Sequence, residues 1–301
     1  MDRPGILHVF SPLPHVSPFD MTMAYDAGFD AVIPYPNVAL GEIPGLVQDV
    51  IFPRSPKDLR RSAILVGGRD GGIAMDMVDA AKEAMVPPFE VSILADPSGA
   101  FTTAAAVVAC VERKLQQQHQ MELEGARVVI FGGTGPIGVA TGVIASLAGA
   151  TTTLVDYKSI DVALSKAAEY NRRRNTNLRG AYGCSDADNA RLVSGQDVVI
   201  CTAKAGVQVL SASVLGDARR LKVAADINAR PPAGIEGINP KDDGVPAQYA
   251  TGAPGAVSIG PLTIGKVKVR TQQALLRSML ATDRPVYLDL AHAFRTAREL
   301  L

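Results

Sequence analysis

Short apolar runs alternate with helix-like segments along the first hundred residues. Four runs have the length of buried strands: ILHVF (6–10), AVIPY (31–35), SAILVGG (62–68) and EVSILAD (90–96). The helix-like segments MTMAYDAG (21–28) and GGIAMDMVDAAKEAM (71–85) come between members of this series. Strands separated by helices predict a parallel sheet with right-handed crossovers, and therefore an N-terminal α/β domain.

A second series follows residues 102–125, whose composition favours a long connector helix that starts at a threonine. Its predicted strands are RVVIF (127–131), TTTLVD (151–156), DVVICTA (197–203) and KVAADIN (222–228), and its predicted helices are PIGVATGVIASLAG (136–149) and VALSKAAEYNRR (162–173). Two amphipathic segments, QQALLRSML (272–280) and LDLAHAFRTARELL (288–301), are expected to be helices that return to the first domain. The pattern thus predicts a two-domain α/β protein.

Composition narrows the class of protein. At 301 residues and 47% hydrophobic composition, the chain is long enough for two cores. Lys plus Arg equals Asp plus Glu at 30 each, so no overall charge favours nucleic acid or a membrane as partner. No stretch resembles a signal peptide or a transmembrane helix. The three cysteines, Cys110, Cys184 and Cys201, lack a disulfide or metal-ligand spacing. We therefore expect a cytoplasmic protein without a metal, in which each cysteine is a small core residue.

The stretch RVVIFGGTGPIG (127–138) carries the pattern G-x-G-x-x-G directly after a strand and at the opening of a helix. In that context Gly133 permits a tight turn, Gly135 lets the backbone approach a pyrophosphate, and Gly138 lets the helix lie close to the strand. Unpaired N–H groups at the helix N-terminus favour the phosphates. The candidate cofactor contacts of this turn are Gly133, Thr134, Gly135, Pro136, Ile137 and Gly138.

An acidic residue, Asp156, ends the next predicted strand. A carboxylate there can accept hydrogen bonds from the adenosine ribose, and it repels a 2′-phosphate. Lys158 could partly neutralise such a phosphate, so these residues favour NAD and leave NADP as the alternative. Ala203, Asp226 and Asn228, at the ends of later strands, complete the candidate cofactor contacts, because ligands bind beyond the carboxyl ends of such sheets.

Acid–base chemistry has few candidates in this sequence. The Tyr-x-x-x-Lys pair of short-chain dehydrogenases, the nucleophile elbow and the P-loop are all absent. Of the four histidines, only His15, in the loop SPLPHVSPFD (11–20), is placed to face a cleft. The missing proton shuttle favours a substrate that releases hydride without losing a proton, such as a methylene carbon between two nitrogens.

With this chemistry in view, the chain resembles the bacterial NAD(P)-dependent methylene-tetrahydromethanopterin dehydrogenases, relatives of the methylene-tetrahydrofolate dehydrogenases. The matching stretches span nearly the whole chain: SPFDMTMAYDAGFD (17–30), VPPFEVSILADPSGAFTTAAA (86–106), VVIFGGTGPIG (128–138), VAADINARPPAGIEGI (223–238) and IGKVK (264–268). Two of them, ADPSGAFTTAA and ADINARPPAGIEG, are together more specific than the glycine pattern alone.

The resemblance implies hydride transfer from the methylene bridge of a reduced pterin carrier to NAD(P), giving the methenyl form, within one-carbon oxidation of formaldehyde. It also implies a homo-oligomer, a trimer or a hexamer. The nucleotide domain (103–269) would be inserted into a pterin-binding domain (1–102 plus 270–301). Some members use NADP and carry Gly-Arg-Lys after the second nucleotide-domain strand, where this chain has Asp156-Tyr157-Lys158, and this difference favours NAD.

Residues of the pterin site are implied by the same resemblance. Asp20 matches a family aspartate that would contact the pterin or stabilise a developing cation, with a helix N-cap as its structural alternative. Lys268 matches a family lysine, with an exposed strand position as its alternative. These two are the candidate catalytic residues, and the expected substrate contacts are His15, Ser17, Asp20, Asp96, Ser98, Thr102 and Lys268. The loop with Asp96, Ser98 and Thr102 could instead cap the connector helix.

Two other interpretations stay open. A methylene-tetrahydrofolate dehydrogenase would carry a tyrosine and a lysine one helical turn apart, whereas Tyr25 is followed by Asp-Ala-Gly-Phe. A non-catalytic NAD-sensing protein would bind the cofactor without turnover, and no helix-turn-helix or basic stripe supports that role.

Overall fold

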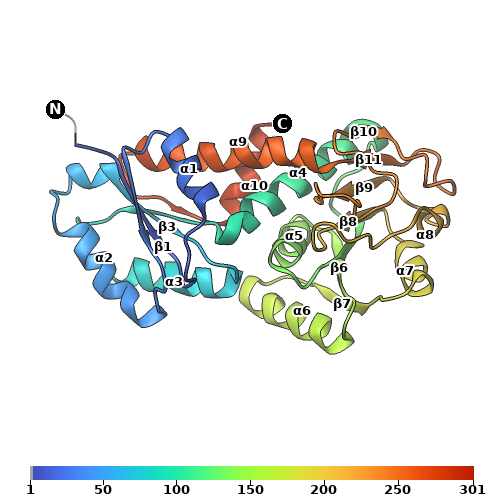
Figure 1. Ribbon diagram of the computed structural model, residues 1–301, viewed down its shortest axis with the longest axis horizontal. Coiled ribbons are helices and arrows are strands. Elements are labelled where there is room, and N and C mark those ends of the chain that lie inside the picture. The colour runs from blue at the N-terminus through green and yellow to red at the C-terminus, as the bar shows by residue number, and fades with distance from the viewer. Residues whose placement is uncertain (1–2) are drawn as a thin grey trace. The chain divides into compact units, whose positions relative to one another are not determined.

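The computed structural model describes residues 3–301 and divides into two compact units (Figure 1). The first unit runs to Thr102 and resumes over Val269–Leu300. The second unit covers Thr103–Lys268, together with Leu301. The second unit is therefore an insertion in the chain of the first, and each unit contains its own sheet.

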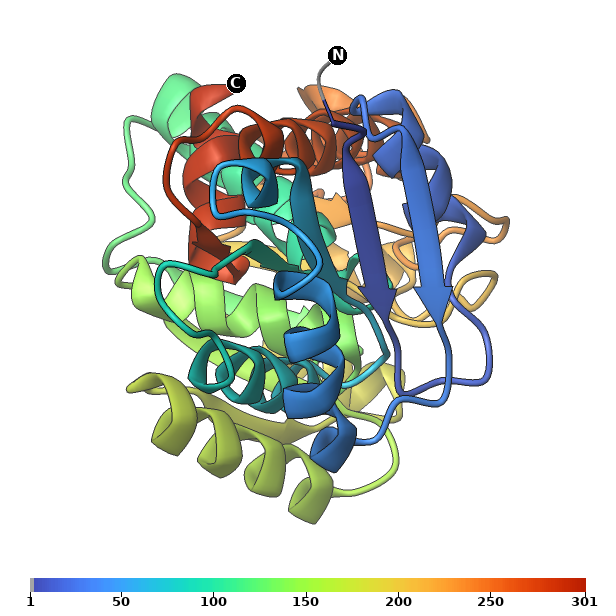
Figure 2. The same cartoon turned by 90° about the vertical axis from the view of Figure 1, so that its left-hand side faces the viewer.

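The first unit contains a five-stranded parallel sheet in the order β12-β4-β3-β1-β2. Its strands are β1 (Ile6–Phe10), β2 (Ala31–Tyr35), β3 (Ser62–Val66), β4 (Ser92–Ala95) and β12 (Tyr287–Leu288). Figure 2 shows β1 and β2 side by side and pointing the same way. The first four strands confirm the predicted runs. The sequence pattern did not predict β12, because two residues are too few to show a period.

Helices cover both faces of this sheet. The helices α2 (Ile43–Ile51) and α3 (Gly71–Glu83) lie on one side and α1 (Pro18–Asp26) on the other (Figure 1). Helix α10 (Leu290–Glu299) follows β12, and three short 3-10 turns, η1 (Leu40–Glu42), η2 (Asp58–Arg61) and η3 (Pro97–Gly99), join other elements. Because both faces are covered, β3 and β4 are buried at every position, which explains their continuous apolar sequences.

The second unit contains a seven-stranded sheet in the order β10-β11-β9-β8-β5-β6-β7, parallel except for the β10–β11 pair. Its strands are β5 (Arg127–Phe131), β6 (Thr151–Asp156), β7 (Arg179–Tyr182), β8 (Val198–Cys201), β9 (Val223–Asp226), β10 (Asp243–Pro246) and β11 (Val257–Ile259). Helices α5 (Pro136–Leu147) and α6 (Ile160–Arg174) lie on one side, and α7 (Asp186–Val193) and α8 (Ala212–Gly216) on the other (Figure 1).

Two long helices differ from their predicted bounds. Helix α4 (Ala100–His119) begins before the predicted threonine and ends six residues before Gly125. Its end coincides with Gln120, whose φ of 50° is incompatible with a right-handed helix. Helix α9 (Pro261–Leu280) begins eleven residues before the predicted Gln272. The stretch IGKVK is therefore helical, and the strand position considered for Lys268 was wrong.

Each sheet has a point where the strand order reverses. In the first sheet β1 lies between β2 and β3, and in the second sheet β5 lies between β6 and β8. The chain loops leave in opposite directions at such a point, which opens a crevice at the carboxyl ends of the strands. Ligand sites are therefore expected after β1 and β3 in the first unit, and after β5 and β8 in the second.

Candidate active site

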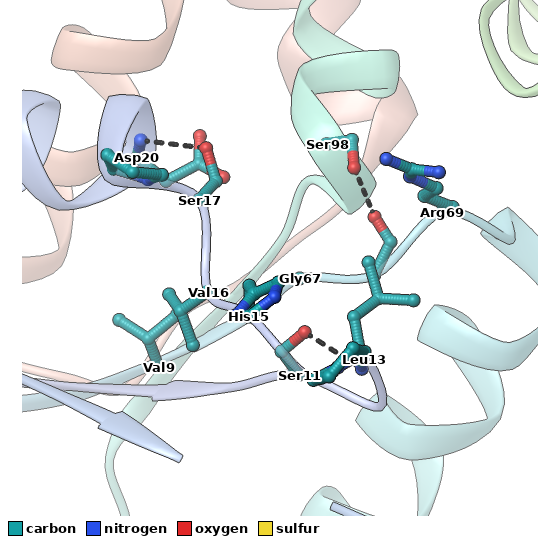
Figure 3. Close-up of a pocket in the computed structure, with 13 residues that line it drawn as sticks. Val9, Ser11, Leu13, His15, Val16, Ser17, Asp20, Gly67, Arg69 and Ser98 are labelled. Carbon is teal, nitrogen blue, oxygen red and sulfur yellow. Dashed lines mark hydrogen bonds between the residues drawn. The ribbon is translucent and has the colours of Figure 1, made fainter. Parts of the chain in front are cut away.

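A pocket of about 420 Å³ opens at the reversal point of the first sheet (Figure 3). Its walls come from the loop after β1, the start of α1, the loop after β3 and the turn after β4. Four of the expected substrate contacts line it: His15, Ser17, Asp20 and Ser98. Ser11, Gly67, Gly68 and Arg69 also line it, and no pattern in the sequence indicates them because only the fold brings the two loops together.

Asp20 is buried in the wall of this pocket, with 3% of its surface exposed. It lies in the first turn of α1 and is not the N-cap, because Ser17 Oγ accepts the hydrogen bond from Asp20 N at 3.3 Å. Its own carboxylate oxygen Oδ1 accepts a hydrogen bond from Gln272 Nε2 of α9 at 2.8 Å. The N-cap alternative for Asp20 was therefore wrong, and Ser17 has that role.

Ser98 has an unusual backbone conformation for a residue other than glycine. Its φ of 51° and ψ of 34° fall in the left-handed region. The side-chain Oγ donates a hydrogen bond to Gly68 O at 2.6 Å, which ties the turn after β4 to the loop after β3 (Figure 3). Backbone strain of this kind concentrates at functional sites, and Ser98 lies on the pocket.

Asp96 and Thr102 are not in the pocket wall, contrary to our expectation. Both side chains are fully buried. Asp96 Oδ1 accepts hydrogen bonds from the backbone N–H groups of Phe101 and Thr102, and Oδ2 accepts one from Thr102 Oγ1 at 2.6 Å. These bonds satisfy donors at the start of α4, so Asp96 acts as its cap. We do not retain the pair as substrate contacts.

Lys268 is the last residue that the second unit contributes to α9. It is not among the residues that line the pocket of the first unit. Its assignment as a catalytic and substrate-binding residue therefore remains a prediction from the family pattern.

The glycine turn after β5 is closely packed against the second sheet. A Cβ atom on Gly133 would lie 2.7 Å from Ile130 O, and one on Gly138 would lie 2.3 Å from Gly132 O. Gly132, which we had not singled out, has a φ of 71°, and a Cβ there would lie 2.7 Å from the backbone of Ala203. The turn therefore requires three glycines for its own packing.

Gly135 differs from these three glycines because nothing in the protein crowds it. The nearest atom to a Cβ built there is Gly132 O, at 3.4 Å. Gly135 is the N-cap of α5, Pro136 occupies the first helical position, and Ile137 follows in the first turn. The open space beside Gly135 and the unpaired N–H groups of the helix start form the kind of cradle that binds phosphates.

Asp156 lies at the end of β6, and its carboxylate is bound to the glycine turn. Oδ2 accepts a hydrogen bond from Thr134 Oγ1 at 2.5 Å, and Oδ1 accepts from Lys158 N at 2.8 Å and Ser159 N at 3.0 Å. Burial raises the pKa of the carboxyl, but these hydrogen bonds and the charge of Lys158 outweigh it, so the pKa lies below its ordinary value. The Lys158 ammonium itself lies 5.4 Å from the ring centroid of Tyr157.

A second pocket, of about 340 Å³, lies beside this turn at the reversal point of the second sheet. Ala203 lines it, as do residues that we had not predicted: Gly132, Tyr157, Cys184, Asn189 and Lys204. Cys184 is exposed, so its assignment to the core was wrong, whereas Cys110 and Cys201 are buried as expected.

Asp226 and Asn228 shape a loop of the second unit. The Asp226 carboxylate is fully buried and accepts hydrogen bonds from the N–H groups of Asn228, Gly234 and Ile235. Burial raises the pKa of Asp226 despite these three bonds. Asn228 is buried as well, and its Oδ1 accepts from Gly206 N and Arg230 N. Neither side chain lines the second pocket, and their assignment as cofactor contacts remains a prediction.

The second unit fits a nicotinamide dinucleotide on two observations. At Gly135, a Cβ would make no contact closer than 3.4 Å, and a helix N-terminus of this kind can bind a pyrophosphate. In the adjoining pocket, Asn189 is buried, and its Oδ1 has no hydrogen-bond partner among the described residues. A donor of a bound ligand or an ordered water would satisfy this acceptor.

Comparisons with known proteins show which family the chain is similar to. A family model described as methylene-tetrahydromethanopterin dehydrogenase, N-terminal, matches residues 18–98. The chain is 41% identical over 296 residues to the NAD(P)-dependent methylenetetrahydromethanopterin dehydrogenase of Methylorubrum extorquens, covering 98% of each chain. It is 30% identical over 284 residues to the bifunctional protein MdtA of the same organism, covering 94% of each.

Among solved structures, shikimate 5-dehydrogenase from Listeria monocytogenes in complex with shikimate and NAD is similar. The similarity covers 97% of this chain and 96% of that one, with a TM-score of 0.54 at 12% sequence identity. At this identity the likeness concerns the fold alone, and it confirms the predicted α/β class. The identity over nearly the full length also confirms the resemblance found in the motifs: the chain belongs to the family of NAD(P)-dependent methylene-tetrahydromethanopterin dehydrogenases.

Proposed function

We propose that this enzyme transfers a hydride from methylene-tetrahydromethanopterin to NAD(P), and that its substrate binds in the pocket around Asp20. The observation that carries the proposal is a buried carboxylate in the wall of a pocket at the reversal point of the first sheet. It is supported by the 41% identity to a relative whose name states this activity. The reaction belongs to the one-carbon oxidation of formaldehyde.

In this proposal, the glycine turn and Asp156 bind the dinucleotide. The N–H groups at the start of α5 would donate hydrogen bonds to the pyrophosphate, and the Asp156 carboxylate would accept them from the adenosine ribose. Bound NAD(P) supplies the hydride acceptor. Because Asp156 has a lowered pKa and stays ionised at neutral pH, it opposes a ribose 2′-phosphate, so we propose NAD as the preferred form.

Asp20 stabilises the charge that develops on the pterin. A hydrogen leaves the methylene carbon with its electron pair, and the methenyl product carries a positive charge shared by its two nitrogens. No proton is transferred, so no general base is needed. A fixed, buried carboxylate in the pocket wall favours the cation over the neutral substrate. His15, Ser17 and Ser98 are proposed to position the pterin, and Lys268 remains a proposed further contact.

Isotope transfer tests the reaction. With deuterium at the methylene carbon, the label is expected on reduced NAD(P), and label in the solvent would rule out direct hydride transfer. Initial rates with NAD and NADP, each against the tetrahydromethanopterin and the tetrahydrofolate substrates, separate the two pterin classes. A higher kcat/KM with the folate would favour the methylene-tetrahydrofolate alternative, and binding of NAD with no turnover would favour a sensing protein.

We further propose that the protein is a homo-oligomer, a trimer or a hexamer, and that it acts in the cytoplasm. The first statement rests on the family pattern. Light scattering on the purified full chain measures the mass directly, and a mass equal to the 31.6 kDa of one chain would contradict it.

A further inference from the structure

Gln272 contacts the Asp20 carboxylate from a distant part of the sequence. The two residues are 252 positions apart, and Nε2 of Gln272 lies 2.8 Å from Oδ1 of Asp20. Gln272 is fully buried and Asp20 is 3% exposed, so the hydrogen bond is shielded from solvent. Both residues belong to the first unit. Asp20 lines the pocket whereas Gln272 does not, and the hydrogen bond between them connects the glutamine to the pocket wall.

A buried carboxylate needs such a donor for two physical reasons. Burial favours the protonated form of a carboxyl, whereas a donor bound to an oxygen favours the ionised form. A hydrogen bond to a charged group is also stronger than one between neutral groups, and it restrains the rotation of the side chain. An amide has no ionisable proton, so this donor is present at every pH at which the protein is folded.

We infer that Gln272 is a positioning residue for the reaction. It holds the Asp20 carboxylate in a fixed orientation toward the pterin, and it contacts neither substrate nor cofactor. The inference rests on the proposed function, since it takes Asp20 to be the group that stabilises the cationic product. Gln272 was not among the residues that the sequence indicated for the site.

The adjacent residue offers a matched control. Gln273 has the same side chain on the same helix, and it is half-buried and outside the pocket. The variants Gln272→Met and Gln273→Met remove the same amide with little change in volume. We expect Gln272→Met to lower kcat about tenfold or more, with the dissociation constant of NAD unchanged. Gln273→Met is expected to keep the parent kcat.

A double-mutant cycle separates positioning from a general structural effect. If Gln272 acts through Asp20, Gln272→Met in an Asp20→Asn background has little further effect on kcat. A full tenfold loss in that background would overturn the inference, and so would an unchanged kcat in Gln272→Met alone. Should Gln272→Met fail to fold, Gln272→Glu preserves the shape and replaces the donor by a second acid, and it is expected to show the same loss of kcat.

Asp20→Asn alone separates the proposed role of Asp20 from the inference about Gln272. If this variant retains the parent kcat, the proposed role of Asp20 is wrong, and the inference about Gln272 is lost with it. If Asp20→Asn lowers kcat but Gln272→Met and Gln272→Glu do not, only the inference about Gln272 is wrong.

Discussion

At the residue scale, four buried aspartates have different roles because different donors surround them. Asp96 and Asp226 accept from neighbouring backbone N–H groups and are fully buried, so they hold a helix start and a loop. Asp20 accepts from a distant glutamine and lines a pocket. Asp156 is bound to the turn that we propose for the nucleotide. Residue type alone therefore does not identify the functional carboxylates.

Asp156→Gly tests the coenzyme preference. Loss of the carboxylate removes the repulsion of a 2′-phosphate, so the ratio of kcat/KM for NADP to that for NAD should rise on the order of tenfold. Steady-state rates with both coenzymes measure this ratio. Asp161→Asn, a nearby exposed acid, is the control and should leave the ratio unchanged. The same ratio in Asp156→Gly as in the parent would mean that the adenosine ribose binds elsewhere.

His8 predicts how stability changes with acid. Its Nδ1 lies 3.1 Å from Tyr35 Oη, and burial, with a smaller effect of Arg54, lowers the pKa of His8 to about 4. The unfolded chain, with a histidine pKa near 6.5, binds more protons between these values. The free energy of unfolding should therefore fall as the pH drops from about 6.5 to about 4, by at most about 1.4 kcal/mol per pH unit.

Urea unfolding at pH 7 and pH 4.5 measures this loss. The parent should lose more stability between the two pH values than His8→Gln, which has no titrating ring. Equal losses would show that the folded protein does not hold His8 neutral.

At the element scale, the glycines of the turn between strand β5 and helix α5 have two different roles. Gly132, Gly133 and Gly138 are needed because backbone lies within 2.8 Å of any Cβ that would replace their hydrogens. Gly135 has no such neighbour. We therefore expect the missing side chain of Gly135 to matter for ligand binding, whereas Gly132, Gly133 and Gly138 are required for the packing of the turn.

Two alanine variants separate these tasks. Gly138→Ala should destabilise the protein by about 2 kcal/mol or more, because its Cβ would lie 2.3 Å from Gly132 O. Gly135→Ala should leave the free energy of unfolding within about 1 kcal/mol of the parent. Its dissociation constant for NAD should nevertheless rise on the order of tenfold, since the new methyl group occupies the phosphate cradle. Calorimetry of NAD binding and denaturant unfolding measure the two effects, and tight NAD binding by Gly135→Ala would contradict the assignment.

At the scale of the whole molecule, the two units share one feature of sheet topology. Each contains a sheet whose first strand lies between two later strands, and each has a pocket at that point. Within residues 3–301, no helix is both long enough and apolar enough to cross a membrane. The charged residues balance at 30 of each sign, so the specificity of the molecule depends on local groups in these pockets.

Thiol labelling tests which cysteines are buried and whether NAD binds in the pocket beside the glycine turn. Burial raises the pKa of Cys110 and of Cys201 to about 12, whereas Cys184 is exposed and lines the pocket beside the glycine turn. A disulfide reagent should therefore modify one thiol per native chain and all three after unfolding. Saturating NAD should slow the native reaction. Cys184→Ser is the control that should not react when folded, and labelling at an unchanged rate with NAD would place the nucleotide away from this pocket.

The sequence by itself determined the parallel α/β class, most strands and the glycine turn with Asp156. These features are local: a buried strand needs only its own apolar run, and the turn is contiguous with the strand and helix that flank it. Only the tertiary structure decided which polar residues meet. In the folded protein Gln272 donates a hydrogen bond to Asp20, Asp96 caps helix α4, and Cys184 is exposed. Such contacts depend on the packing of distant segments, and no periodic pattern records them.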